Sequence, residues 1–125
     1  KNYVDYTHKK LQTKLGFKNV YLNDIFYCPH HPDKGFKNEI IKYKKKCKCR
    51  KPRPGLILEA KKKYNIELSK SYFLGNSKAD YLAAKNANVK AVVINNKELT
   101  KEVLQKKNFS SLKDFTKFFL KKKYI

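Results

Sequence analysis

Residues 72–94 read YFLGNSKADYLAAKNANVKAVVI, and this stretch decides the fold class. The aromatic and apolar run at its start and the β-branched run at its end predict two short buried strands. Between them, residues 79–86 have apolar side chains at helical spacing, with Leu82, Ala83 and Ala87 expected to face inward. A strand, a helix and a second strand in this order predict an α/β fold with a parallel sheet.

The residues on the carboxyl side of this stretch, and those just before it, predict two more helices. One covers 56–64 and follows Pro54, a residue favoured in the first turn of a helix. The other follows Ser110 or Ser111, either of which suits a helix N-cap. Its expected inward face consists of Leu112, Phe115, Phe118 and Phe119.

The amino-terminal part of the chain is less regular. Residues 4–15 have a rough helical period that Gly16 would end as a C-cap. The apolar run at 24–28 predicts a buried strand. The following Lys-rich segment, 29–54, has no period and is too polar to pack by itself, so something else must order it.

Composition limits the class of protein. The 125 residues contain 31 Lys and Arg against 10 Asp and Glu, a net charge of +21, yet 41% are hydrophobic, which argues against disorder. No apolar run approaches the roughly 20 residues of a membrane helix, and the first residues of this sequence do not have the apolar pattern expected of a signal-peptide h-region. We therefore expect one cytoplasmic domain over 1–125. Only Arg50 and Arg53 are arginine, so most of the charge is a uniform lysine background.

Three cysteines and two histidines fall within 22 residues, in a Cys-Pro-His-His group and a Cys-Lys-Cys group. Two close ligand pairs separated by a loop can complete a closed, structural zinc site, which would also order the polar segment at about 28–50. Isolated buried cysteines and a disulfide are the alternatives. Three cysteines in one polar loop disfavour the first, and their odd number disfavours the second. The expected ligands are Cys28, His30, Cys47 and Cys49. His31 is expected to be a loop side chain, because His30 pairs with Cys28 at the spacing of the other group.

Both arginines lie in the segment Cys-Arg-Lys-Pro-Arg-Pro-Gly at 49–55, against a background that otherwise uses lysine. The prolines stiffen this segment, which therefore presents Arg50 and Lys51 together. A bidentate guanidinium beside an ammonium suits a phosphate monoester, whereas a solvated basic turn is the alternative. The Gly-Asn-Ser turn at 75–77 is a weaker signal: it precedes a helix N-terminus that favours anions, Asn76 offers an amide oxygen to Mg²⁺, and Asp80 can hold the loop.

Taken together, these motifs resemble one family closely. The Cys-Pro-His-His-Pro, Cys-x-Cys-Arg-Lys-Pro and Phe-Leu-Gly-Asn-Ser-Lys-Ala-Asp segments are similar to the D-glycero-D-manno-heptose 1,7-bisphosphate and histidinol-phosphate phosphatase subgroup of the haloacid dehalogenase-like hydrolases. The similarity runs from about residue 27 to the end. It implies a Rossmann-like, three-layer α/β/α domain that hydrolyses a sugar phosphate monoester with Mg²⁺, through an aspartyl-phosphate formed on an Asp-x-Asp motif.

The resemblance also implies a role for individual residues. Arg50 corresponds to the residue that recognises the substrate, and Lys51 to the one that stabilises the transferred phosphoryl group. Ser77 corresponds to a substrate-contacting position. Asn76 lies where the family has a Mg²⁺-binding Asp, so we expect a weakened magnesium site, since Mg²⁺ prefers carboxylate. The implied cofactors are therefore structural Zn²⁺ and catalytic Mg²⁺.

Two departures from the family affect the expected activity. The family's Asp-x-Asp strand precedes the region of similarity, and none of Asp5, Asp24 and Asp33 lies in such a context. The sequence also contains no Met. We therefore expect the nucleophile to lie upstream of Lys1 and these 125 residues to be inactive by themselves.

Several functions remain open at this point. The first is a 7-phosphatase acting on heptose 1,7-bisphosphate in lipopolysaccharide precursor synthesis, and histidinol-phosphate phosphatase is the alternative substrate. From other classes, a zinc-stabilised nucleic-acid-binding module and a non-catalytic family member compete with it. For the first we expect a monomer with a small phosphorylated sugar as its partner, no membrane partner and no specific nucleic acid.

Overall fold

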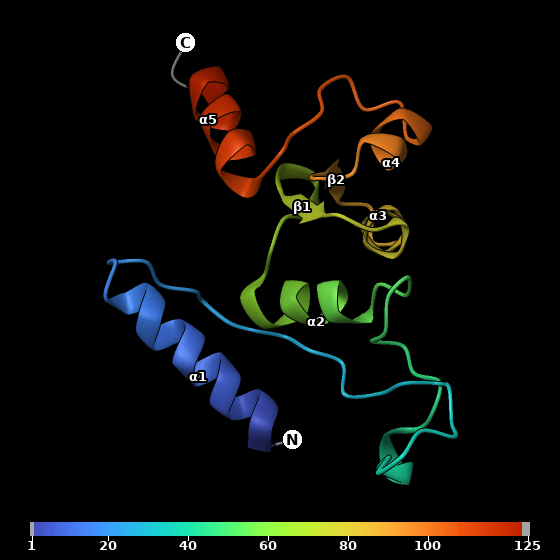
Figure 1. The fold of residues 1–125 in the computed structure, drawn as a ribbon. Coiled ribbons are helices and arrows are strands. Elements are labelled where there is room, and N and C mark those ends of the chain that lie inside the picture. The colour runs from blue at the N-terminus through green and yellow to red at the C-terminus, as the bar shows by residue number, and fades with distance from the viewer. Residues whose placement is uncertain (1, 124–125) are drawn as a thin grey trace. The chain divides into compact units, whose positions relative to one another are not determined.

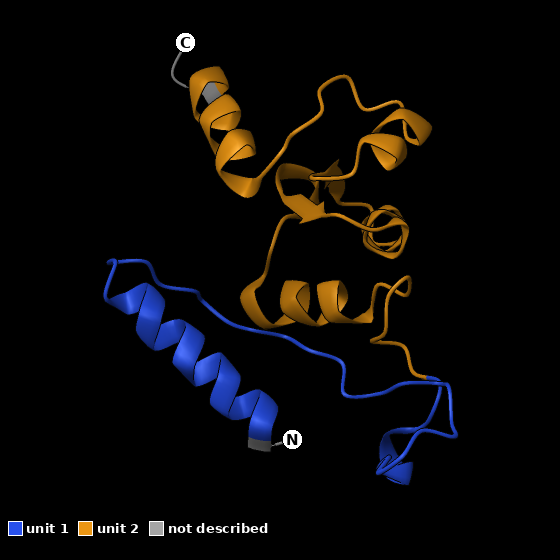
Figure 2. Cartoon of the chain, viewed as in Figure 1, with its two compact units in different colours: residues 1–46 blue, residues 47–125 orange. Residues whose placement is uncertain are grey.

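The computed structural model describes residues 2–123, which form parts of two compact units, Lys1–Lys46 and Cys47–Ile125 (Figure 2). The first unit contains α1 (Asn2–Gly16) and the short 3₁₀ helix η1 (Ile41–Tyr43), joined by irregular chain (Figure 1). The predicted helix at 4–15 is thus confirmed. It ends in a turn in which the amide of Lys18 donates to the Leu15 carbonyl (2.8 Å).

The strand predicted at 24–28 is wrong, because this segment has no regular secondary structure in the described chain. An apolar run becomes a strand only when a neighbouring strand accepts and donates its backbone hydrogen bonds. Here the amide of Ile25 donates instead to Oδ1 of Asp24 (2.7 Å), a local bond that competes with a ladder.

The second unit alternates helices and strands. Its elements are α2 (Gly55–Tyr64), the 3₁₀ helix η2 (Leu68–Lys70), β1 (Tyr72–Gly75), α3 (Lys78–Asn86), β2 (Lys90–Val93), α4 (Lys97–Glu102) and α5 (Leu112–Lys123). The two strands pair in parallel, from Tyr72 opposite Lys90 to Gly75 opposite Val93. The expected parallel α/β arrangement is therefore confirmed, with α3 as the crossover between the strands.

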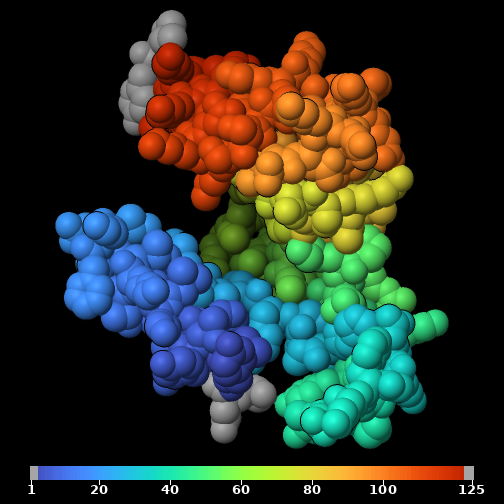
Figure 3. Space-filling model, viewed as in Figure 1, coloured from blue at the N-terminus to red at the C-terminus, as the bar shows by residue number. Residues whose placement is uncertain are grey.

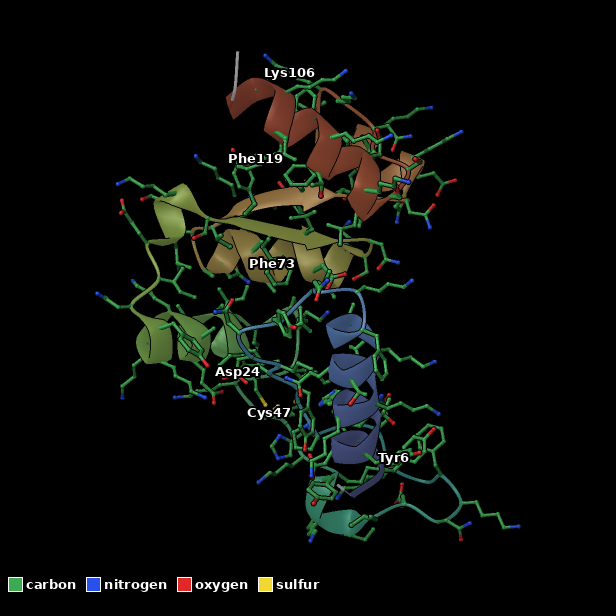
Figure 4. The ribbon with its side chains drawn as sticks, turned by 90° about the vertical axis from the view of Figure 1, so that its left-hand side faces the viewer. Tyr6, Asp24, Cys47, Phe73, Lys106 and Phe119 are labelled. Atoms are coloured by element: carbon green, nitrogen blue, oxygen red, sulfur yellow. The ribbon has the colours of Figure 1, made fainter. Side chains whose placement is uncertain are left out.

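Alternate side chains of β1 pack on opposite faces of this sheet. On one face, Phe73 packs with Ile57 of α2 against a buried cluster formed by Ala84, Ala87 and Val89. On the other face, the ring of Tyr72 lies 5.2 Å from that of Phe119 of α5. Figure 4 shows Phe73 and Phe119 on these two sides of the strands. Helices thus cover both faces of the small sheet, the layering expected of a three-layer α/β/α domain.

An amide side chain completes the outer edge of β2. Oε1 of Gln105 accepts from the amide of Val93 (2.7 Å), and Nε2 of Gln105 donates to the Val93 carbonyl (2.8 Å). One residue later, Ile94 forms an isolated parallel bridge with Phe109. The Gln105 amide thus takes the place of a neighbouring strand at Val93.

The two carboxyl-terminal helices differ from the sequence prediction in part. The sequence pattern does not predict α4, whose polar residues have no clear apolar period. Ser111 caps α5 as predicted, since its Oγ accepts from the Asp114 amide (3.1 Å). Phe115 is buried as expected, but Leu112 is wrong as a core residue because it is 59% exposed. Leu112 is the first residue of α5, and the residues of this helix that pack on the sheet lie further along it.

Between residues 2 and 123, the helices are all too short or too polar to cross a membrane.

Candidate functional site

Four predicted metal ligands form a group that can hold a metal ion. One ligand atom each from Cys28, His30, Cys47 and Cys49 lies within 4.8 Å of the other three. Within the pairs, Sγ of Cys28 is 3.8 Å from Nδ1 of His30, and Sγ of Cys47 is 3.2 Å from Sγ of Cys49. The four side chains are all partly buried. Thiolate and imidazole at these separations suit a tetrahedral metal site.

His31 does not belong to this group. Its Nδ1 accepts from the amide of Asp33 (3.2 Å), which fixes the ring within the loop. The structure thus brings His30, and not His31, beside the three cysteines, and the role of His30 as a metal ligand stays a prediction.

The Cys-Arg-Lys-Pro-Arg-Pro-Gly segment folds back on itself. Nη1 of Arg53 donates to the carbonyl of Cys47 (2.7 Å), and the amide of Arg53 donates to the carbonyl of Arg50 (3.0 Å). The amide of Gly55 donates to the carbonyl of Lys48 (3.0 Å), and a Cβ at position 55 would lie only 2.2 Å from that same oxygen. A glycine is therefore required where this segment enters α2. Of the two arginines of the chain, Arg53 has its guanidinium bonded to the backbone inside this turn.

Lys51 joins this segment to the loop at the carboxyl end of β1. Its ammonium forms an ion pair with Oδ1 of Asp80, a residue 29 positions further along the chain. The side chain of Asp80 is only 9% exposed, whereas that of Lys51 is 48% exposed. A buried carboxylate thus anchors an ammonium that still reaches solvent. A second bond holds the segment against α3, because Nδ2 of Asn86 donates to the carbonyl of Pro52 (3.2 Å).

The second carboxylate oxygen of Asp80 organises the loop itself. Oδ2 accepts from Oγ of Ser77 (2.7 Å), from the amide of Ser77 (3.1 Å) and from the amide of Asn76 (3.2 Å). In return, Oγ of Ser77 accepts from the amide of Asp80 (3.1 Å), which completes a capping box at the start of α3. Ser77, predicted to contact substrate, therefore has its hydroxyl bonded within the loop in this structure.

These bonds determine the charge state of Asp80. Burial raises the pKa of its carboxyl, but hydrogen bonds from Lys51 and Ser77 and the charge of Lys51 outweigh burial and hold this pKa below its ordinary value. The group is therefore a carboxylate at neutral pH, and the Lys51 ammonium faces a full negative charge.

Gly75 permits the close approach of this carboxylate to the strand end. A Cβ at position 75 would lie 2.2 Å from Cβ and 2.6 Å from Cγ of Asp80, closer than side-chain atoms can come. The glycine of the Gly-Asn-Ser turn is thus explained by the room that Asp80 needs.

Asn96, which the sequence analysis missed, links the loops that follow the two strands. Its Nδ2 donates to the carbonyl of Asn76 (2.8 Å), and its Oδ1 accepts from the amide of Leu99 as the N-cap of α4 (3.0 Å). The side chain of Asn76 is exposed at this edge. An Asn just after a β-branched strand was the available signal, since Asn is favoured at N-caps.

The predicted phosphate-site residues therefore divide into two groups. Lys51, Asn76 and Ser77 come together around Asp80 at the carboxyl end of β1, the edge at which open α/β sheets bind ligands. Arg50 is exposed and adjoins Lys51 in the chain. This arrangement can bind a phosphoryl group through a preorganised cation.

The comparisons with known proteins agree with one another on the family that this chain resembles. Residues 35–94 match the haloacid dehalogenase-like hydrolase family. The chain is 37% identical over 107 residues to the D-glycero-beta-D-manno-heptose-1,7-bisphosphate 7-phosphatase of Photorhabdus laumondii, an alignment that covers 82% of this chain and 55% of the relative. It is 38% identical over 90 residues to the protein of the same name from Escherichia coli K12, covering 70% of this chain and 45% of the relative.

A solved structure shares the fold. It is the crystal structure of D,D-heptose 1,7-bisphosphate phosphatase from B. bronchiseptica complexed with magnesium and phosphate, with a TM-score of 0.73 and 24% identity. The similarity covers 95% of this chain and 64% of that one. The present chain thus spans about half the length of the curated relatives, and it shares the fold of this solved structure.

Proposed function

This chain belongs to the haloacid dehalogenase-like hydrolases, and we propose that it takes part in hydrolysing the phosphate monoester of a phosphorylated sugar. D-glycero-D-manno-heptose 1,7-bisphosphate is the first candidate substrate, because the similar relatives are named as 7-phosphatases of this compound. Such a reaction would belong to heptose precursor synthesis for lipopolysaccharide, in the cytoplasm. The ion pair between Lys51 and Asp80 at the end of β1 is the observation that supports this proposal most strongly.

Lys51 supplies the positive charge that the transferred phosphoryl group needs. An ammonium has three donors, and Asp80 occupies only one of them, so the others can contact phosphate oxygens. Phosphoryl transfer depends mainly on positioning and on neutralising charge on the equatorial oxygens. Arg50, next to it, is proposed to recognise the substrate through its planar guanidinium.

Asp80 and Ser77 hold this cation before substrate arrives. The carboxylate is nine-tenths buried and its second oxygen is fixed by three donors of the loop, so it cannot turn away from Lys51 without breaking them. Preorganised charge costs no rearrangement during the reaction. Asp80 is therefore a positioning residue in this proposal, and Ser77 is proposed to contact substrate only with the part of its surface that the capping box leaves open.

The proposed reaction also needs a carboxylate nucleophile. The 125 residues contain no Asp-x-Asp pair, the motif that the family resemblance implies. We propose that an aspartate outside these residues attacks the phosphorus while the phosphorus–oxygen bond to the sugar breaks and the sugar leaves as an alcohol, protonated by the second Asp of that motif. Water then attacks the aspartyl-phosphate, which frees the carboxylate and releases inorganic phosphate. Lys51 is proposed to reduce the repulsion between the attacking carboxylate and the phosphate. By this proposal, residues 1–125 alone bind phosphate and do not turn it over.

The residues at the end of β1 fit a magnesium ion only in part. The side chain of Asn76 offers one neutral amide oxygen, whereas both oxygens of Asp80 are engaged by Lys51 and by the loop. Mg²⁺ prefers carboxylate oxygens. We propose Asn76 as a weak ligand that requires carboxylates from outside these residues. When bound, the ion would neutralise phosphate charge.

The cysteine and histidine group fits a zinc ion. Three thiolates and one imidazole are soft and borderline donors in the number that a closed tetrahedral zinc site uses. Cys47 and Cys49 lie directly before Arg50 and Lys51, and Arg53 bonds back to the Cys47 carbonyl. A structural zinc here is proposed to fix the start of the phosphate-binding segment.

The experiment is a phosphate-release assay on the longest polypeptide that the gene encodes, with heptose 1,7-bisphosphate and histidinol phosphate compared at equal concentration. Replacing Lys51 by Gln removes a charge-assisted contact and should lower kcat/KM at least tenfold. Lys48→Gln is the matched control, because Lys48 is an exposed lysine directly before the segment that contains Lys51. Arg50→Gln should change the ratio of the two substrates more than it changes turnover.

Two results would contradict the proposal. Equal activities of the Lys51→Gln and Lys48→Gln proteins would show that Lys51 does not contact the phosphoryl group. Release of phosphate from neither substrate by the unmodified polypeptide would favour a non-catalytic family member.

A further inference from the structure

The exposed side of α5 has two parallel rows that the proposed phosphatase site does not use. Leu112, Thr116 and Leu120 follow one another at intervals of four residues, and Lys113, Lys117 and Lys121 repeat the interval one position later. Residues four apart lie one above another on a helix, so each set forms a row, and the two rows are neighbours. All six side chains are exposed.

The side of α5 next to the apolar row is already occupied. Phe115 is buried, its ring lies 5.3 Å from that of Phe109, and the ring of Phe119 lies edge-on to that of Tyr72 of β1. The apolar row borders this core-facing side, because Leu112 and Thr116 stand three positions before Phe115 and Phe119, whereas the row of lysines lies further round the helix. Figure 3 shows α5, in red, at the surface of the second unit.

The apolar row is unusually exposed for a helix that is otherwise packed. Leu112 is 59% exposed and Leu120 is 45% exposed. Between them, Oγ1 of Thr116 donates to the carbonyl of Leu112 (2.9 Å), so the hydroxyl is satisfied within the helix. The row thus presents apolar surface with its one hydroxyl already bonded.

Positive charge lies on two sides of α5. The three lysines of the second row stand beside the apolar row. On the other side of the helix, Lys107 and Lys122 stand over the ring of Phe118, with Nζ to ring-centre distances of 4.6 and 4.9 Å. The one acidic residue of α5, Asp114, accepts from the Ser110 amide at the helix start (3.1 Å). The face is therefore strongly basic over the length of α5.

We propose that this face of α5 docks on an anionic phospholipid surface. A short apolar row beside a row of lysines is what an interfacial helix uses: the leucines enter the boundary between headgroups and acyl chains, and the lysines extend to lipid phosphates. The complementary charge favours phospholipid, and the leucines favour it over nucleic acid, whose backbone offers them no apolar contact. The proposal departs from the sequence-based expectation of no membrane partner, and it does not depend on the proposed phosphatase activity.

The experiment is co-sedimentation of the full chain with lipid vesicles containing about 30% phosphatidylglycerol, compared with vesicles of phosphatidylcholine alone. Binding should require the anionic lipid and weaken as salt rises, because surface charges are screened. A lysine beside an anionic membrane contributes about fivefold to binding, so replacing Lys113, Lys117 and Lys121 together by Gln should weaken binding about a hundredfold.

Two further variants separate this face from the general lysine background. Replacing Lys61, Lys62 and Lys85 by Gln removes the same charge from exposed positions of α2 and α3 and should weaken binding only a few-fold. Replacing Leu112 and Leu120 by Ser keeps every lysine and should still weaken binding at least tenfold. Circular dichroism checks that each variant is folded.

The proposal fails if the protein does not bind the anionic vesicles. It also fails if the two lysine variants lose affinity equally, since diffuse charge would then explain the binding. Tighter binding to a DNA duplex at the same salt, unaffected by the leucine substitutions, would identify the face as a nucleic-acid surface and overturn the lipid proposal.

Discussion

Replacing Asp80 by Asn tests the network around the strand end. The carboxylate of Asp80 is nine-tenths buried, pairs with Lys51 through Oδ1 and accepts three hydrogen bonds through Oδ2. An Asn side chain has one acceptor and one donor group, so whichever way it turns, its NH₂ faces donors from Lys51 or from the loop. Lost charge-assisted bonds cost about 1.5–3 kcal/mol each, and the half-exposed Lys51 recovers part of this from water. We expect a loss of about 3 kcal/mol in the free energy of unfolding at pH 7.

The pH dependence of this loss gives a second, independent result. The folded-state pKa of Asp80 is lowered, so its contribution to stability is present above the pKa of the unfolded chain, near 3.8, and disappears as pH falls through the lower folded value. Since the Asn variant has nothing to titrate at this position, the difference between the two proteins should be constant from neutral pH to about pH 5. Below about pH 4 the difference should shrink.

Urea denaturation of both proteins at several pH values measures the difference directly. Asp114→Asn is the matched control. The carboxylate of Asp114 also accepts a hydrogen bond from a backbone amide at the start of a helix, but Asp114 is only half-buried. The control should lose at most about 1 kcal/mol. A loss at position 80 no larger than the control's, or one that persists unchanged in acid, would refute the reasoning about Lys51 and the buried carboxylate.

Three further substitutions test other parts of the site. Gly75→Ala should destabilise the protein by about 2–3 kcal/mol in urea denaturation, because its Cβ would meet Asp80, whereas Gly16→Ala, with its nearest contact at 3.8 Å, should cost almost nothing. Cys47→Ser should reduce the zinc content of purified protein from about one ion per chain to a small fraction, measured by atomic emission, and lower the melting temperature; unchanged zinc would remove Cys47 from the ligands. Asn76→Asp should strengthen Mg²⁺ binding about tenfold in calorimetry, since it adds a carboxylate, and no change would place the magnesium site elsewhere.

Local sequence signals predicted the elements that local interactions determine. The β-branched run at 91–94 and the aromatic run at 72–74 form β2 and β1, and the apolar period between them forms α3 with Ala83 and Ala87 buried. The same kind of run at 24–28 is not a strand, because strand formation depends on a partner that no local pattern specifies. Leu82, expected to face inward, is only partly buried, whereas Ala84 is fully buried. The smallest side chains fit where the helix comes closest to the sheet.

The residues of the candidate site could be singled out from the sequence, but most of the contacts between them could not. Cysteine spacing singled out the four residues that the structure brings together, and the two arginines singled out the segment that contains Lys51. The partner of Lys51 is 29 residues away, a pairing that only the folded chain brings about. The function of Gly75 and the bond from Asn96 to the Asn76 carbonyl likewise depend on distances between separate elements. Such contacts have no local signature in a sequence.

Titration of inorganic phosphate into the 125-residue chain tests whether Lys51, held by Asp80 at the end of β1, binds the phosphoryl group. Calorimetry or phosphorus NMR on the unmodified chain, on Lys51→Gln and on Lys48→Gln gives three dissociation constants. We expect the dissociation constant to be at least tenfold larger for Lys51→Gln and almost unchanged for Lys48→Gln. Equal constants for the two variants would contradict it.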